Sequence, residues 1–187
     1  MLDNTEEALQ KFRKNVIKQA RTNLTKKDKN VTKNLYKSLD SDIVVSPNSF
    51  SLAFAMSDYA KFQDEGVKGA DPSKVKGKNA IKGQQAPNSR YKFGSGNFGG
   101  TWESFVDKIE EWAKRRNLRF RDEKGKYKKG SMRSFAEVVA NNIYARGIKP
   151  SRFFSRAFET QFKKLPENIV EGYALDVARL LETSMKK

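Results

Sequence analysis

Residues 43–57, with the sequence IVVSPNSFSLAFAMS, decide the fold class of this chain. They begin with three β-branched residues, continue through the turn-forming Ser46-Pro47-Asn48, and alternate large apolar with small side chains from 49 to 57. This pattern predicts an antiparallel hairpin with strands over 35–45 and 49–57. A hairpin alone is marginal in water, so its large-side-chain face must pack on another element. That face carries Phe50, Leu52, Phe54 and Met56.

Residues 3–26 supply the element on which the hairpin can pack. Apolar side chains recur there at steps of three and four, which predicts one long amphipathic helix. Asp3 followed by Glu6 resembles a capping box at its start. The apolar face consists of Leu9, Phe12, Val16, Ile17, Ala20 and Leu24.

The rest of the chain has further helical patterns. A short helix or turn is expected over 58–65, closed by Gly66, and a longer helix should begin after Thr101 as N-cap. Another is expected over 131–145 with Gly147 as its stop, followed by a helix capped by Ser151 and a last helix that begins at Pro166. We therefore predict a single α+β domain over 1–187: a long N-terminal helix, a small antiparallel β-sheet with a hairpin, and three or more further helices toward the C-terminus. Long basic loop insertions are expected at 68–100 and 114–130.

The composition removes several kinds of chemistry. The 187 residues include no His and no Cys, so imidazole bases, thiolate nucleophiles, thiolate zinc sites and disulfides are excluded. No phosphate-binding loop occurs, and the glycine cluster at 94–100 lacks the preceding apolar strand of a dinucleotide site. We expect no enzyme and no cofactor. A metal-dependent nuclease using carboxylates such as Asp64 or Asp122 stays open as an alternative.

The ends and apolar runs of the sequence bear on its location. The N-terminal residues are acidic where a secretion signal would be basic and then apolar. No apolar run approaches the ~20 residues needed to cross a bilayer. We expect a soluble protein without a signal sequence, with no membrane among its partners.

Positive charge dominates the surface chemistry, since Lys and Arg number 38 against 22 Asp and Glu. Segments 68–94 and 113–133 carry +6 and +8 of the net +16. The first has the composition of a long exposed loop, and the second interleaves cations with Phe120 and Tyr127. Such segments can contact nucleic acid or an acidic protein surface, or can merely keep the protein soluble. The candidate contact residues are Lys68, Lys74, Lys76, Lys78, Lys82, Arg90, Lys92, Lys114, Arg115, Arg116, Arg119, Arg121, Lys126, Lys128 and Lys129.

Three motifs resemble the tail-completion or neck proteins of tailed bacteriophages. The first is NLYKSL at 34–39, at the entry to the hairpin, and the second is DYAKFQDEG at 58–66. The third is SFA at 134–136 with IYARGIKPSRFFSRA at 143–157, similar to the family's R-G-I-K-P-x-x-F-F-x-x-A stretch. The matching residues are Leu35, Ser38, Tyr59, Ala60, Phe62, Gly66, Gly147, Lys149, Pro150, Phe153 and Phe154.

The resemblance implies a structural virion protein of the neck or tail that does no chemistry. Its subunits would form a homo-oligomeric ring joining the head connector to the tail, after assembly in the host cytoplasm. Its partners would be copies of itself, portal-proximal connector, adaptor or tail-tube proteins, and DNA in the channel. Closing a ring requires one face of the subunit to match a different face of the next. The alternative function is non-sequence-specific nucleic-acid binding through the basic segments.

The residues themselves suggest that the motifs determine the fold. Tyr59 and Phe62, three positions apart, can anchor a short helix on the hairpin. Gly66 permits a backbone conformation that other residues avoid. Pro150 with Phe153 and Phe154 can fix the angle between two helices.

Overall fold

The computed structural model of the chain describes residues 2–29, 32–46, 49–74, 83–96, 100–121 and 124–185. The fold is α+β, as the sequence predicts, with the long N-terminal helix, the hairpin and helices toward the C-terminus. Its contacts divide the chain into two compact units, Met1–Ala60 with Arg152–Lys187, and Lys61–Ser151. We call these the first and the second unit. That the chain is a single domain stays a prediction.

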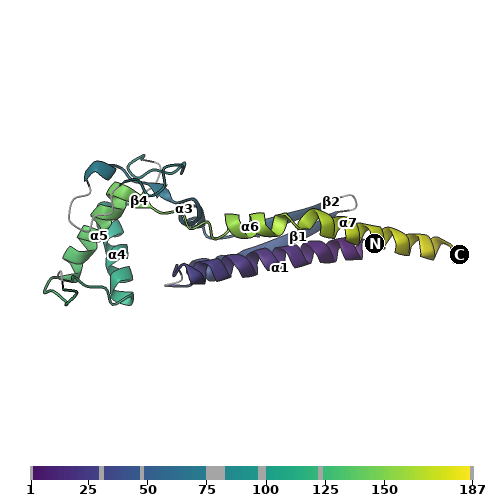
Figure 1. The fold of residues 1–187 in the computed structure, drawn as a ribbon, viewed down its shortest axis with the longest axis horizontal. Coiled ribbons are helices and arrows are strands. Elements are labelled where there is room, and N and C mark those ends of the chain that lie inside the picture. Colours follow the sequence, from purple (N-terminus) through teal and green to yellow (C-terminus); the bar gives the residue numbers. More distant parts are fainter. Residues whose placement is uncertain are drawn as a thin grey trace. The chain divides into compact units, whose positions relative to one another are not determined.

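The first unit is a layer of helices packed on a two-stranded sheet. Helix α1 (Asp3–Lys26) lies antiparallel to α6 (Ser155–Phe162) and α7 (Leu165–Met185), shown in purple and yellow in Figure 1. Strands β1 (Asp40–Ser46) and β2 (Ser49–Ala55) form the antiparallel hairpin, in a register that pairs Asp40 with Ala55 and Ser46 with Ser49. The predicted hairpin and the predicted bounds of the long helix are confirmed.

An aromatic core joins these layers. The Phe12 ring centroid lies 6.3 Å from that of Phe54 on β2 and 5.7 Å from that of Phe158 on α6, both edge to face. Leu9 and Val16 belong to the same buried cluster, against which Phe50 and Leu52 pack. The large-side-chain face of the hairpin therefore packs on α1, as its alternation predicts.

The predicted strand over 35–45 is wrong in its first part. Residues Asn34–Ser38 form the short helix α2, and the strand begins only at Asp40. Leu35 and Leu39, four positions apart, are both buried in one cluster, a spacing that suits a helix. Arg21 of α1 donates to the carbonyl oxygens of Tyr36 (3.1 Å) and Leu39 (2.9 Å), which keeps the end of this turn on α1.

The predicted capping box at the start of α1 is also wrong. Leu2 is the N-cap and offers no side-chain hydrogen bond, while Asp3 lies inside the first turn. The buried carboxylate of Asp176, on α7, accepts hydrogen bonds from the backbone N–H groups of Asn4 (3.0 Å) and Thr5 (2.9 Å) instead. Gly172 allows this approach, because a Cβ there would lie 2.9 Å from the Asn4 carbonyl oxygen.

The second unit combines a helical hairpin with short strands. It contains most of α3 (Ala60–Glu65), β3 (Val67–Lys68), the 3₁₀ turn η1 (Pro72–Lys74), α4 (Trp102–Arg115), α5 (Met132–Arg146) and β4 (Gly147–Ile148). Helices α4 and α5 pack together through the buried residues Val106, Ala136 and Ala140. Thr101 accepts a hydrogen bond from the Ser104 N–H, so the predicted N-cap is confirmed. Ser131 accepts one from the Ser134 N–H and is the N-cap of α5.

Gly147 ends α5 for a reason beyond helix capping. Its φ of +91° lies in the region that favours glycine, and a Cβ there would meet the Val67 carbonyl oxygen at 2.0 Å. Strand β4 pairs with β3 at this point, with Lys68 opposite Gly147. The predicted stop is confirmed, and the close pairing of β3 explains why a side chain cannot stand there.

Gly66 closes α3 in the same way. Its φ is +76°, as the prediction of a left-handed closure requires, and a Cβ there would lie 2.7 Å from the Pro150 nitrogen. The second and third sequence motifs therefore touch at this glycine.

Two further predictions need correction. The segment 68–94 is not wholly an exposed loop, because Ala86 and Ser89 are buried and the Phe93 N–H donates to the Lys68 carbonyl. Its described part after residue 82 folds back on β3. Ser151 does not cap the next helix, since α6 begins at Ser155; its buried hydroxyl donates to the Gln63 carbonyl oxygen at 2.5 Å.

Candidate functional site

The cations of the first basic segment are largely tied to the fold. Lys68 lies in β3, and its backbone forms a parallel β-bridge with that of Lys92. Arg90 forms an ion pair with Glu65 at 2.8 Å and lies over the Tyr91 ring, 5.0 Å from its centroid. The hydrogen bond to Glu65 raises the pKa of Arg90. Lys74 ends η1, and the predicted contacts Lys76, Lys78 and Lys82 lie outside the described residues.

The cations at 114–116 form a solvated helix end rather than part of a loop. Lys114 and Arg115 belong to the last turn of α4, where they pair with Glu110 at 2.6 Å and with Glu111 at 3.7 Å. Arg116 has an interaction partner as well. For these three residues the structure favours the alternative in which the charges merely keep the protein soluble and do not contact a ligand.

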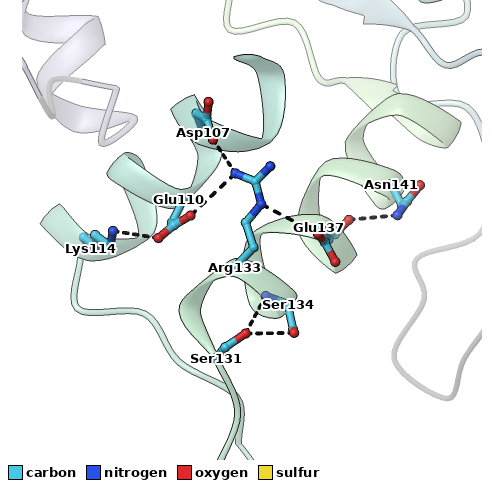
Figure 2. A network of polar contacts seen from close by, with 8 residues as sticks. All are labelled: Asp107, Glu110, Lys114, Ser131, Arg133, Ser134, Glu137 and Asn141. Atoms are coloured by element: carbon cyan, nitrogen blue, oxygen red, sulfur yellow. Dashed lines mark hydrogen bonds and ion pairs between the residues drawn. The ribbon is translucent and has the colours of Figure 1, made fainter. Parts of the chain in front are cut away.

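A network of ion pairs joins α4 to α5 beside this helix end (Figure 2). Arg133, in the first turn of α5, contacts the carboxylates of Asp107, Glu110 and Glu137. The hydrogen bond to Asp107 raises the pKa of Arg133. Glu110 is thus shared between Arg133 of α5 and Lys114 of α4.

The remaining cations lie on a turn between α4 and α5, which we call the cationic hairpin (residues 118–121 and 124–130). Arg121 and Tyr127 form an antiparallel bridge, and the Lys128 N–H donates to the Phe120 carbonyl. The Arg121 guanidinium donates to the Gly125 carbonyl and to the Tyr127 hydroxyl, each at 3.2 Å. It lies 4.7 Å from the Tyr127 ring centroid, and the Arg119 guanidinium lies 6.0 Å away.

A cavity of about 470 Å³ lies between the cationic hairpin and the start of α5. Its apolar part includes Phe120 and Phe135, whose rings meet edge to face at 5.3 Å. Gly130 lies against the Phe120 ring, and a Cβ there would lie 2.8 Å from the ring's Cδ2 atom. The cations that line the cavity are Arg119, Lys128 and Lys129.

The cations of this hairpin differ from their neighbours in pairing. Among the carboxylates that the structure describes, none forms an ion pair with Arg119, Arg121, Lys128 or Lys129. Lys126 has an interaction partner. Only part of the second predicted basic segment therefore forms one site. It consists of these four cations, which form no ion pair with a described carboxylate, and Tyr127.

Sequence reasoning missed a second basic groove, in the first unit. It has a volume of about 710 Å³ and lies between α1 and the stretch from Tyr36 to Ser41. Arg13 donates to the Ser41 carbonyl at 2.7 Å, and Arg21 binds the carbonyls at the end of α2. These cations could have been found from their helical spacing, which places them on one face of α1. The net charge does not show them, because nearby acidic residues cancel them. The cations of the groove are Arg13, Lys14, Lys18, Arg21 and Lys26.

The motif residues of the first unit meet in its core. Leu35, Ala60 and Phe153 come from all three motifs and share one buried cluster. Ser38 accepts a hydrogen bond from the Ser57 N–H at 3.1 Å, and the Phe154 ring lies 5.4 Å from that of Phe54. Tyr59, by contrast, is exposed, so it is not the anchor of α3 that the spacing suggests.

The motif residues of the second unit are arranged around the short strands. The Phe62 ring contacts that of Tyr91, with centroids 4.7 Å apart. Gly66 touches Pro150, Gly147 pairs with β3, and Lys149 is exposed. Most of the motif therefore consists of side chains and glycines that the fold itself requires.

The described residues offer neither a metal site nor a membrane-spanning helix. Within the described ranges, no group of three or more Asp or Glu residues could hold a metal ion. Asp64 is buried and has a partner, and Asp122 lies outside the described residues. None of the helices described is both long enough and apolar enough to cross a membrane.

Comparison of the chain with protein-family models, with curated proteins and with solved structures gave no match.

Proposed function

We propose that this chain is a structural subunit of the neck or tail-completion ring of a tailed bacteriophage, which joins the head connector to the tail. One observation carries the proposal: three motifs that are far apart in the sequence meet in space. Leu35, Ala60 and Phe153 share one buried cluster. Gly66 contacts Pro150. A meeting of this kind is expected if the motifs are the fold determinants of one family.

An uncharged helix face supports association with further subunits. The solvent side of α7 carries Val170, Leu181 and Met185, with exposed fractions of 69%, 60% and 86%. Tyr173 is also exposed, and the intervening positions 174 and 177 are Ala and Val. These residues recur at helical spacing over about 22 Å of helix. Continuous apolar surface of this kind is typical of a protein interface.

The test is the mass of the purified chain by light scattering at low and high salt, together with its binding to purified connector and tail-tube proteins. We expect a uniform oligomer that resists salt, because the proposed contact is apolar. The variant Val170→Glu/Leu181→Glu should dissociate it, because it buries two charges in the contact. The control Lys164→Glu/Asn168→Glu, at exposed polar positions, should leave the mass unchanged.

The proposal would be overturned by a chain that stays monomeric at every concentration and binds none of the connector or tail proteins. An oligomer with equal sensitivity to both variants would reject the role of the α7 face. A fold check by circular dichroism accompanies both variants.

A further inference from the structure

Four cations of the cationic hairpin differ in pairing from the cations that flank them in the chain. Just before and just after them in the chain, cations are matched with carboxylates: Lys114 with Glu110, and Arg133 with Asp107. Arg119, Arg121, Lys128 and Lys129 have no such match among the described residues. Placing like charges together on one turn is unfavourable without a counter-charge. A polyanionic ligand would supply it.

The arginines of the hairpin are already oriented. Arg121 is held by hydrogen bonds to the Gly125 carbonyl and the Tyr127 hydroxyl, and its guanidinium lies against the Tyr127 ring. A planar guanidinium fixed in this way keeps further N–H groups for phosphate oxygens. Because its side chain is ordered before binding, less conformational entropy is lost on contact.

The aromatic residues favour nucleic acid over an acidic protein. Tyr127 is 59% exposed although it lies between cations. The neighbouring cavity of about 470 Å³ combines the Phe120 and Phe135 rings with Lys128 and Lys129. Cations that follow a phosphate backbone, beside aromatic rings on which bases stack, are typical of sites for single strands. An acidic peptide would satisfy the charges but would leave the exposed ring without a matching surface.

We infer that the cationic hairpin is a nucleic-acid-binding site, in which Arg119, Arg121, Lys128 and Lys129 contact phosphates and Tyr127 stacks on a base. This inference goes beyond the proposed function, since ring assembly does not require nucleic acid. The two proposals can therefore be rejected separately. The ring subunit is tested by the mass of the oligomer, and the nucleic-acid site is tested by the affinity for an oligonucleotide. The site is expected to bind without sequence preference, because its cations are assigned to phosphates and an aromatic ring can stack on any base.

The experiment measures fluorescence anisotropy of the full chain with a labelled single strand of about 16 nucleotides. A duplex of the same length and polyglutamate of equal charge form separate arms. Salt is varied from about 50 to 200 mM, over which four phosphate contacts should contribute a log–log slope of about −3 for the single strand. The quadruple variant Arg119→Gln/Arg121→Gln/Lys128→Gln/Lys129→Gln should lose this slope and at least about tenfold in affinity at the lowest salt.

The matched control removes the same charge from α1. Lys11, Lys14, Lys18 and Lys26 are exposed, and the last three line the basic groove of the first unit. Changing these four to Gln should alter the affinity by less than about threefold, the share due to net charge alone. Equal losses in the two quadruple variants, or a greater loss in the α1 variant, would overturn the site.

Tyr127 separates stacking from charge. Tyr127→Ala should weaken single-strand binding more than duplex binding, whereas Tyr127→Phe should retain most of the single-strand affinity, because it keeps the ring and loses only the hydroxyl to which Arg121 donates. Equal weakening of both arms by Tyr127→Ala would overturn the stacking role. Polyglutamate bound as tightly as the oligonucleotide would overturn nucleic acid as the ligand, in favour of an acidic protein surface. Tryptophan fluorescence checks the fold of the hairpin variants, since Trp102 and Trp112 both lie in α4 of this unit, and far-UV circular dichroism checks the α1 variant.

Discussion

The two units of the chain differ in what their charged side chains do. In the first unit, Asp176 caps the start of α1, and Arg13 and Arg21 bind backbone carbonyls near β1. In the second unit, the cationic hairpin holds charges that no described carboxylate matches. Arg146 is buried there with its Nε and Nη2 atoms lacking hydrogen-bond partners. Charge that completes the backbone hydrogen bonds should stabilise the fold, while unmatched charge should be dispensable for folding.

The units also differ in how they are packed. Large aromatic side chains fill the first unit, where Phe12, Phe54 and Phe158 meet edge to face. The second unit has a smaller buried cluster of Val106, Ala136 and Ala140, and depends on backbone segments that touch at glycine. Loss of side-chain volume should therefore cost most in the first unit, and a gain of side-chain volume should cost most in the second.

The largest effect is expected from Gly147→Ala. The new Cβ would meet the Val67 carbonyl oxygen at 2.0 Å, and the φ of +91° adds backbone strain. We expect the second unit to lose about 4 kcal/mol or more, enough to unfold a marginal unit. Tryptophan emission reports this directly, because both tryptophans of the chain lie in α4.

The control for this variant is Gly96→Ala. Gly96 has a similar φ of +75° but open space around it, so only the strain of about 1 kcal/mol applies. If both variants unfolded at the same denaturant concentration, the close pairing of β3 with β4 would not hold the second unit together.

Asp176→Ala should give the next largest effect, in the first unit. Burial by itself raises the pKa of Asp176, but hydrogen bonds from Asn4 and Thr5 outweigh it and hold the pKa well below its usual range. The variant leaves the first backbone N–H groups of α1 without this acceptor. We expect the thermal midpoint of the first unit to fall by about 10 °C, followed by far-UV circular dichroism.

The pH dependence of this effect has a definite sign. A carboxylate with a depressed pKa in the folded state stabilises the fold above the ordinary Asp pKa, and the contribution is lost as pH falls toward the folded value. The difference in midpoint between the wild type and Asp176→Ala should therefore shrink between about pH 5 and pH 2. The exposed carboxylate of Asp42 serves as control through Asp42→Ala. A difference that stays constant with pH would contradict the role of the charged form.

Arg146→Met should have the smallest effect, and of the opposite sign. The side chain is 9% exposed and two of its nitrogen atoms lack partners, so its burial costs free energy that an apolar side chain of similar length avoids. We expect denaturant unfolding, followed by tryptophan emission, to show a gain of about 1 kcal/mol. Arg146→Lys keeps the charge and should give no gain. A loss of stability in Arg146→Met would mean that the guanidinium has a stabilising role of its own.

Local patterns predicted much of the fold. The bounds of α1, the hairpin, the cap Thr101 and the stop at Gly147 all depend on residues close in sequence. The short helix at Leu35 was missed because contacts with Arg21, distant in sequence, fix it. The cap of α1 was misassigned for the same reason, since Asp176 lies 172 positions from Asn4.

The candidate site was predictable as a composition but not as a set of free charges. The basic segment with its interleaved Tyr127 was evident in the sequence. Whether a cation is free depends on three-dimensional neighbours: Arg90 reaches Glu65 across 25 positions, while Arg119 and Arg121 reach Tyr127. The basic groove on α1 could have been found from a helical-wheel projection of residues 3–26, which shows its cations on one face.

The central claim is that the cations of the hairpin serve a ligand and not the fold. Thermal unfolding of the quadruple hairpin variant, with and without a saturating single strand, tests it most directly. The account predicts that the variant without ligand unfolds at the wild-type midpoint, and that the upward shift which the oligonucleotide gives the wild type disappears. A lower midpoint of the variant without ligand, or an undiminished shift with the oligonucleotide, would contradict it.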